Sequence, residues 1–97
     1  MKIEILPAAE REYVAARDWY ESIQAGLGDR FALLVRESMR AIRRNPLRYR
    51  VDKRGYHRAF VSVFPYKIWY RIDDQLIIVV AFAHNHRRPD YWLDRQG

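Results

Sequence analysis

The sequence contains no cysteine and no long apolar run, and glycine and proline are scarce, with 4 residues of each among 97. Without cysteine, neither a disulfide framework nor a thiolate metal site can form, which suits a reducing compartment. Residues 1–12 are too acidic, and apolar over too short a run, to form a secretory signal. The longest apolar run, residues 76–83, is far shorter than the ~18 residues that a membrane span requires. We therefore expect a soluble, cytoplasmic protein with no membrane partner.

Positive charge is in excess, and it is concentrated in one stretch. The net charge is +6. Residues 1–35 carry 4 basic and 6 acidic side chains, residues 36–58 carry 9 and 2, and residues 59–97 carry 5 and 4, so the net charges are −2, +7 and +1. The middle stretch favours a polyanion or an acidic protein segment as partner, although a solvated helix end and loop would have the same composition. The length and the 49% apolar fraction indicate one folded domain, residues 1–97.

Two helices are predicted in the first half of the chain. Pro7 suits the first turn of a helix, and apolar residues then recur at a helical spacing as far as Ile23. Gly26 and Gly28 break this pattern, and Asp29 is a candidate N-cap for a second helix. The second helix should end before the Asn-Pro pair at 45–46, because the residue before a proline is pushed out of the α region. So short a turn predicts an antiparallel helical hairpin.

Strands are predicted at residues 2–6, 56–63, 66–72 and 76–83. The last of these is apolar on both faces, as a central strand would be. The order strand, helix, helix, strand, strand, strand belongs to the α+β class. We therefore predict an N-terminal strand, an α-helical hairpin and then a three-stranded antiparallel sheet, with the helices on one face.

Alternation along residues 66–72 predicts which side chains face the helices. Those on the helix side are expected to be Tyr66, Ile68, Tyr70 and Ile72. The opposite face is expected to be an open, basic and aromatic binding surface, because a hairpin covers only one face. Its side chains are expected to be Arg58, Lys67, Trp69 and Arg71.

A polar and cationic cluster follows the central strand, at residues 84–88. His84 and His86 share a face of an extended chain, so they are candidates for acid–base work, with a structural role the alternative for His84. Arg87 and Arg88 could hold a phosphate bidentately, or could be a solvated edge. Because the only other histidine is distant in sequence and no carboxylates cluster nearby, we predict no metal site and no cofactor. Tyr91 and Trp92 are either a C-terminal anchor or part of a binding site, whereas Trp19 and Tyr20 are expected in the core.

Several motifs together resemble the RelE/ParE superfamily of type II toxin–antitoxin modules. They are ARDWYE (16–21), GLGDRF (26–31), RRNPLRY (43–49), FPYKIWYR (64–71) and AHNHRRPDYW (83–92). The resemblance implies a compact toxin that arrests growth, is associated with plasmid stabilisation, and is neutralised by a cognate antitoxin in a hetero-oligomer. It also implies one of two targets, since some members cut mRNA on the ribosome and others poison DNA gyrase.

The ribonuclease branch keeps a pattern of cations that this chain matches only in part. Arg58 and Lys67 match basic positions on the second and third strands, and His86 or Arg87 matches the position beyond the fourth. Phe60 replaces a second basic residue, and the motifs FPYKIWYR and RRPDYW are closer in sequence to the ParE branch. The resemblance therefore favours action on gyrase.

Two alternatives to a gyrase toxin stay open. The first is a metal-independent endoribonuclease with Arg58, Lys67, His86 and Arg87 as catalytic residues. The second is a noncatalytic nucleic-acid-binding module that uses the basic stretch 36–58. If the protein acts by binding, the expected contact residues are Trp69, Arg71, Arg88, Tyr91 and Trp92.

Overall fold

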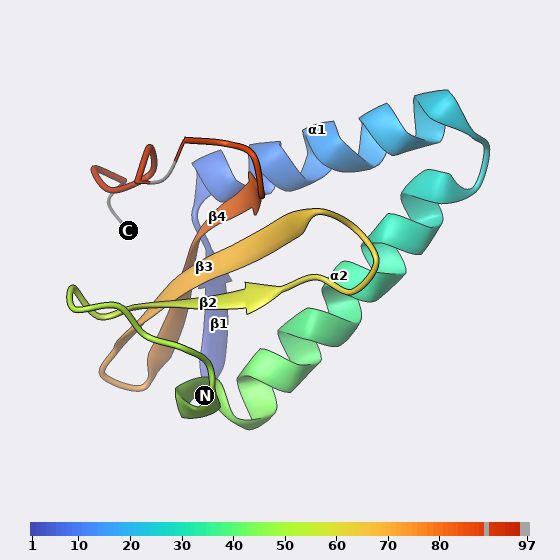
Figure 1. Cartoon of the computed structure of the whole chain (residues 1–97). Helices are drawn as coiled ribbons and strands as arrows, with labels where there is room; N and C mark the ends of the chain where they lie inside the picture. The colour runs from blue at the N-terminus through green and yellow to red at the C-terminus, as the bar shows by residue number, and fades with distance from the viewer. Residues whose placement is uncertain (89, 96–97) are drawn as a thin grey trace.

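The computed structural model describes residues 1–88 and 90–95, and it confirms the predicted α+β class (Figure 1). The strands form one four-stranded sheet in the order β1-β4-β3-β2. The N-terminal strand joins this sheet in parallel beside β4, and the other neighbours are antiparallel. The elements are β1 (Lys2–Ile5), α1 (Pro7–Ile23), α2 (Leu27–Arg44), the short 3-10 helix η1 (Pro46–Arg48), β2 (Tyr56–Phe60), β3 (Tyr66–Asp73) and β4 (Leu76–His84).

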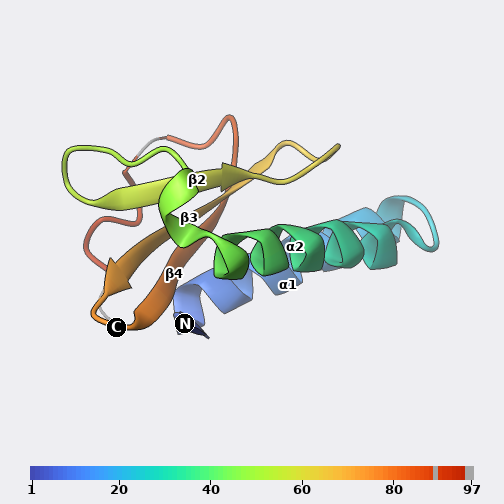
Figure 2. The ribbon, with the colours of Figure 1, turned by 90° about the horizontal axis from the view of Figure 1, so that it is seen from below.

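Both helices lie on one side of the sheet, as Figure 2 shows from below. Their apolar stripes meet the sheet in an aromatic core, where the Phe64 ring lies 4.8 Å from Tyr20 and 5.1 Å from Phe31 between ring centroids. Tyr20 is buried as expected, but Trp19 is 60% exposed, so its predicted place in the core is wrong. Neighbouring helix positions point about 100° apart, and only one of the two can face the sheet. In residues 1–88 and 90–95, no helix has the length and apolar character needed to cross a membrane.

The register of β3 is the predicted one. Ile68 and Tyr70 belong to the core on the helix side, while Trp69 belongs to a second apolar cluster on the opposite face. A bulge interrupts the pairing with β4, where Trp69 is opposite Ala81 but Tyr70 is opposite Val79. A bulge places two consecutive residues on the same side of a strand. Val80 and Ala81 accordingly both lie in the second cluster, away from the helices.

In the turn between the helices, the N-cap of α2 is not the predicted residue. The N-cap of α2 is Gly26, whose φ of +89° suits glycine, and Asp29 makes no capping hydrogen bond. Glu21 of α1 takes that role, because its carboxylate accepts hydrogen bonds from the N–H groups of Gly26 and Gly28, each at 2.9 Å. These bonds, first from Gly26 and then from Gly28, lower the pKa of Glu21. The carboxylate thus supplies from the neighbouring helix the acceptor that a local cap would give.

Gly28 allows the two helices to approach closely, and we expect Gly28→Ala to destabilise the protein. A Cβ at this position would lie 2.7 Å from the carbonyl oxygen of Arg17 and 2.9 Å from Cβ of Glu21. Relieving such contacts should lower the free energy of unfolding by about 1–3 kcal/mol, measured by urea denaturation. Gly26→Asn is the control: a Cβ there meets nothing within 4 Å, so only the backbone strain of a positive φ is added, and asparagine adopts positive φ more readily than other non-glycine residues. Equal losses in both variants would contradict this account.

Candidate functional site

The face of the sheet away from the helices carries the predicted cations in three successive cross-strand pairs of β2 and β3. Phe60 of β2 is opposite Lys67 of β3, and Arg58 is opposite Trp69 in the next row. These side chains lie on the same face because β-strand side chains alternate between the two faces. The placement of Arg58, Lys67, Trp69 and Arg71 on one face therefore agrees with the register expected from the sequence.

The centre of this face is not open, so the expectation of an exposed Trp69 is wrong. The C-terminal segment, residues 90–95, crosses the sheet and places Trp92 on Trp69, with ring centroids 4.8 Å apart. Tyr56 closes the other side of Trp92 at 4.7 Å. Trp92 is 1% exposed and Trp69 is 9% exposed. Both tryptophans expected to bind a partner are therefore core residues, which supports the alternative of a C-terminal anchor.

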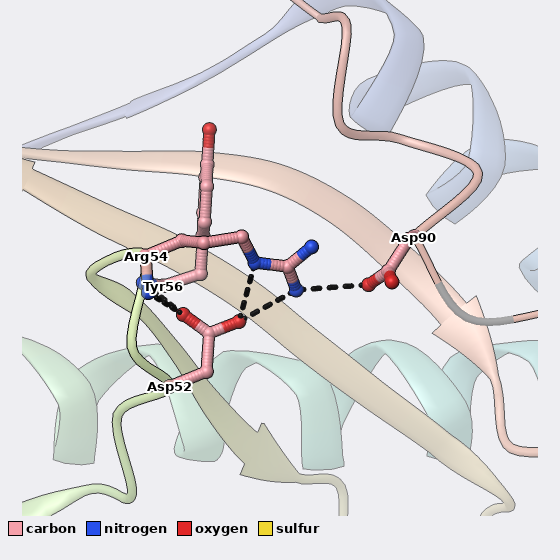
Figure 3. Close-up of polar contacts among 4 residues, drawn as sticks. All are labelled: Asp52, Arg54, Tyr56 and Asp90. Atoms are coloured by element: carbon pink, nitrogen blue, oxygen red, sulfur yellow. Dashed lines mark hydrogen bonds and ion pairs between the residues drawn. The ribbon is translucent and has the colours of Figure 1, made fainter.

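One end of the C-terminal segment is held by a cluster of charges (Figure 3). The guanidinium of Arg54 donates to Asp52 at 2.7 Å and to Asp90 at 2.9 Å. Asp52 also accepts hydrogen bonds from the backbone N–H groups of Arg54 and Tyr56. Partial burial raises the pKa of Asp52, but these hydrogen bonds outweigh it and the pKa lies below its usual value. The loop before β2 and the C-terminal segment are thereby joined through one arginine.

Glu12 of α1 holds the same segment at Tyr91 and at its other end, Arg95. Glu12 accepts hydrogen bonds from the Tyr91 hydroxyl and from the Arg95 guanidinium, the latter at 2.8 Å. It also accepts the N–H of Phe82 at 3.1 Å, and Arg95 donates to the carbonyl of Val80 at 2.9 Å. β1 pairs with β4 only as far as Val79, so these side chains satisfy the backbone groups of β4 beyond β1. Burial, and then the bond to Glu12, raises the pKa of Tyr91.

Sequence reasoning missed Glu12 and Arg95. One signal was present, because Glu12 lies three residues after the buried Ala9 and four before the buried Ala16, on the side of α1 that faces the sheet. A carboxylate on a buried helix face needs a partner. The sequence carries no sign that this partner is Arg95, since the two are far apart in the chain.

Part of the basic surface does remain accessible, at the β2 side of the sheet. Phe60 is 60% exposed. The Arg58 guanidinium lies 5.6 Å from the centre of the Phe60 ring, and the Lys67 ammonium lies 5.9 Å from it. A hollow of about 490 Å³ adjoins this ring along the outer edge of β2, and Arg48 and Arg50 also line it. We call these side chains the edge patch, which consists of Arg48, Arg50, Arg58, Phe60 and Lys67.

The cluster after β4 faces a different part of the molecule. His84 is in edge contact with Tyr66 at 5.2 Å, and Tyr66 packs against the core on the helix side. The Nδ1 atom of His84 accepts the N–H of His86 at 3.0 Å, and their rings are 5.3 Å apart. The Arg87 guanidinium lies 4.0 Å from the centre of the Tyr91 ring. His84, Arg87 and Tyr91 line a hollow of about 310 Å³ beside Trp19 of α1.

The structure therefore divides the predicted catalytic set between two surfaces. Arg58 and Lys67 lie in the edge patch, whereas Arg87 lines the hollow beside α1 and His86 packs on His84 at its rim. Arg71 is half-buried and Arg88 is exposed. Across residues 1–88 and 90–95, no three histidine, aspartate or glutamate side chains gather closely enough to hold a metal ion.

Comparison with known proteins agrees with this architecture. The family model of ParE toxins of type II toxin–antitoxin systems, parDE, matches residues 3–89. No curated protein matches the sequence. Among solved structures, a chain of the chromosomal ParDE toxin–antitoxin system from P. aeruginosa is similar, with a TM-score of 0.76 and 11% sequence identity. The match covers 87% of this chain and 95% of that chain, and at such low identity it shows the fold alone. Since the family model spans most of the sequence, the chain belongs to the ParE toxin family of type II toxin–antitoxin systems.

Proposed function

We propose that this protein arrests growth by binding DNA gyrase, as a ParE-like toxin, and that a cognate antitoxin neutralises it. The observation that carries the proposal is Phe60, which is 60% exposed where the ribonuclease branch keeps a cation. An exposed aromatic ring between Arg58 and Lys67 suits contact with a protein better than stabilisation of a phosphate. Membership of the ParE family supports the same conclusion.

The division of the cationic residues supports binding over catalysis. Cleavage of RNA by its own 2′-hydroxyl needs a base, a proton donor and cations around a single phosphate. Lys67 lies on the sheet face away from the helices, whereas Arg87 lines the hollow beside α1. A single phosphate would have to meet side chains from both surfaces for the predicted catalytic set to act together.

A paired assay of the purified protein tests the proposed function. We expect stabilised gyrase–DNA cleavage complexes in a gyrase reaction and uncut mRNA in a translation extract. Cut mRNA with no effect on gyrase would favour the ribonuclease. Binding to nucleic acid with neither activity would favour the noncatalytic module that uses residues 36–58. In cells, co-expression of the adjacent reading frame should abolish growth arrest, and a folded, expressed protein without any effect on its host would contradict a toxin.

Substitutions should change toxicity by degrees if the protein acts by binding. We expect Phe60→Ala to cost about 1–3 kcal/mol of target binding, as for an aromatic anchor, and Lys67→Ala or Arg87→Ala to cost less than about 1 kcal/mol each, as for charges at a rim. His86→Ala is the control and should have little effect. The measurement is the toxin concentration that gives half-maximal gyrase–DNA cleavage. A loss of about 10²–10³-fold in His86→Ala, with an unchanged circular dichroism spectrum, would instead indicate catalysis.

A further inference from the structure

Among the residues that the structure describes, none pairs with the outer edge of β2 at Phe60. In the pairing with β3, Val61 donates its N–H to the carbonyl of Tyr66 at 2.9 Å, so alternate residues of β2 direct their backbone groups away from the sheet. Arg58 is one of these residues, and its N–H is bonded to the carbonyl of Arg50 at 3.1 Å. Phe60 is the next, and within residues 1–88 and 90–95 its N–H and C=O have no hydrogen-bond partner.

Residues 50–52 already pair with this edge as the beginning of a fifth strand, and the pairing then ends. Val51 forms an antiparallel bridge with His57, and Asp52 donates its N–H to the carbonyl of Tyr56 at 2.9 Å. This strand pairing stops at Arg50, and the hollow of about 490 Å³ lies beyond it, next to Phe60. No described residue therefore occupies the strand position beside Phe60, and the adjoining residues 50–52 already pair with β2 as a strand would.

The charge around this position is positive and lacks counter-ions. Arg48, Arg50 and Arg58 line the hollow, and the Lys67 ammonium lies 5.9 Å from the centre of the Phe60 ring. In the part of the chain that the structure describes, none of these four cations has a carboxylate within 4.0 Å. The edge patch therefore combines an unpaired backbone donor and acceptor, an exposed ring and four uncompensated cations.

We propose that an extended acidic segment of a protein adds as a strand to β2 at Phe60. It would extend the strand pairing that residues 50–52 begin. Its backbone would exchange hydrogen bonds with the N–H and C=O of Phe60, an apolar side chain would cover the ring, and its carboxylates would meet the edge-patch cations. The identity of this partner rests on the proposed function, since the segment would come from the antitoxin. The geometry favours a peptide over the phosphodiester backbone of a nucleic acid, because a phosphodiester has no donor for the carbonyl of Phe60.

A peptide-binding experiment on the full chain tests the proposal without the antitoxin. The probe is a short, acetylated, fluorescent peptide in which glutamate and valine alternate, and binding is followed by anisotropy. Its control replaces glutamate with lysine. Two further peptides carry N-methyl groups on alternate backbone amides, one on the even and one on the odd positions. Only one of these two edges can face β2, so one methylated peptide should bind about tenfold more weakly than the parent and the other should bind almost equally well.

Hydrogen exchange locates the bound peptide. We expect the acidic peptide to slow exchange of the Phe60 amide, while the Val61 amide, already bonded to Tyr66, serves as the internal reference. Arg50→Ala and Arg58→Ala should each weaken binding by about 2- to 5-fold. Arg30→Ala, an exposed arginine of α2 outside the edge patch, should leave it unchanged.

Three results would overturn the proposal: equal binding of the two methylated peptides, unchanged exchange at Phe60, or no binding of the acidic peptide. A single-stranded oligothymidylate that slows Phe60 exchange when the peptide does not would assign the edge patch to nucleic acid. None of these measurements depends on toxicity. If the peptide does not bind but the protein still poisons gyrase, only the docking site is rejected. If the peptide binds as a strand but the protein does not poison gyrase, only the proposed target is rejected.

Discussion

Replacing Trp92 with alanine is expected to lower the free energy of unfolding by about 3–5 kcal/mol, the cost of deleting a large, buried aromatic side chain. Trp92 is 1% exposed and its ring packs against the rings of Trp69 and Tyr56. The loss should also uncover Trp69. Urea denaturation followed by circular dichroism measures the first effect, and a shift of tryptophan emission to longer wavelength at zero denaturant measures the second.

Trp19→Ala is the matched control, because it removes the same side chain from a site that is 60% exposed. We expect it to cost about 1 kcal/mol or less. Truncation after Arg88 should be at least as harmful as Trp92→Ala, since it also removes Tyr91 and Arg95, and far more harmful than His86→Ala. If Trp92→Ala and Trp19→Ala are equally mild, the C-terminal segment does not hold the sheet face in solution.

The second large effect is expected at Glu12, where alanine should cost about 3 kcal/mol. The substitution leaves the guanidinium of Arg95 without its carboxylate and the N–H of Phe82 without its acceptor, and both residues are largely buried. The side chains of Arg95 and Glu12 are only 20% and 17% exposed, so water can replace the lost partner only in part. Thermal and urea denaturation measure the loss.

Glu12→Gln separates the hydrogen bonds from the charge. Glutamine keeps an acceptor for Phe82 and should cost about half as much as alanine, and the double variant with Arg95→Met should show a coupling energy of about 0.5–3 kcal/mol. Tyr91→Phe removes a third member of the cluster and should be milder than Glu12→Ala. Additive losses in Glu12→Gln and Arg95→Met would mean that the pair contributes little to stability.

The register of β3 could be predicted because one of its faces is packed against the helices. Ile68 and Tyr70 must point to that core, and alternation then places Lys67 and Trp69 on the other face. The end of α2 was predictable for an equally local reason, the proline at position 46. The N-cap of α2 was not, because the acceptor comes from Glu21 on the preceding helix and not from the cap position itself.

The sequence contained a signal that the second sheet face is buried, but this signal did not identify the segment that covers it. Residues 76–83 are apolar on both faces, which indicates that something covers each face of β4. On the second face, Ile78, Val80 and Ala83 lie in the cluster with Trp92. The covering segment is short and irregular and has no hydrophobic period of its own, so the pattern could show that a cover exists but not which residues form it.

The sequence by itself determined the element order, the helical hairpin, the register of β3 and the concentration of positive charge, because each of these follows from local periodicity, from turn residues or from composition. Only the tertiary structure decided that Trp92 covers Trp69, that Glu12 meets Arg95, and that Lys67 and Arg87 lie on different surfaces. These three results depend on how distant segments pack, and contacts between distant segments leave no periodic trace in a single sequence. For the same reason the sequence placed the four candidate catalytic residues in one site, and the fold distributes them between two surfaces.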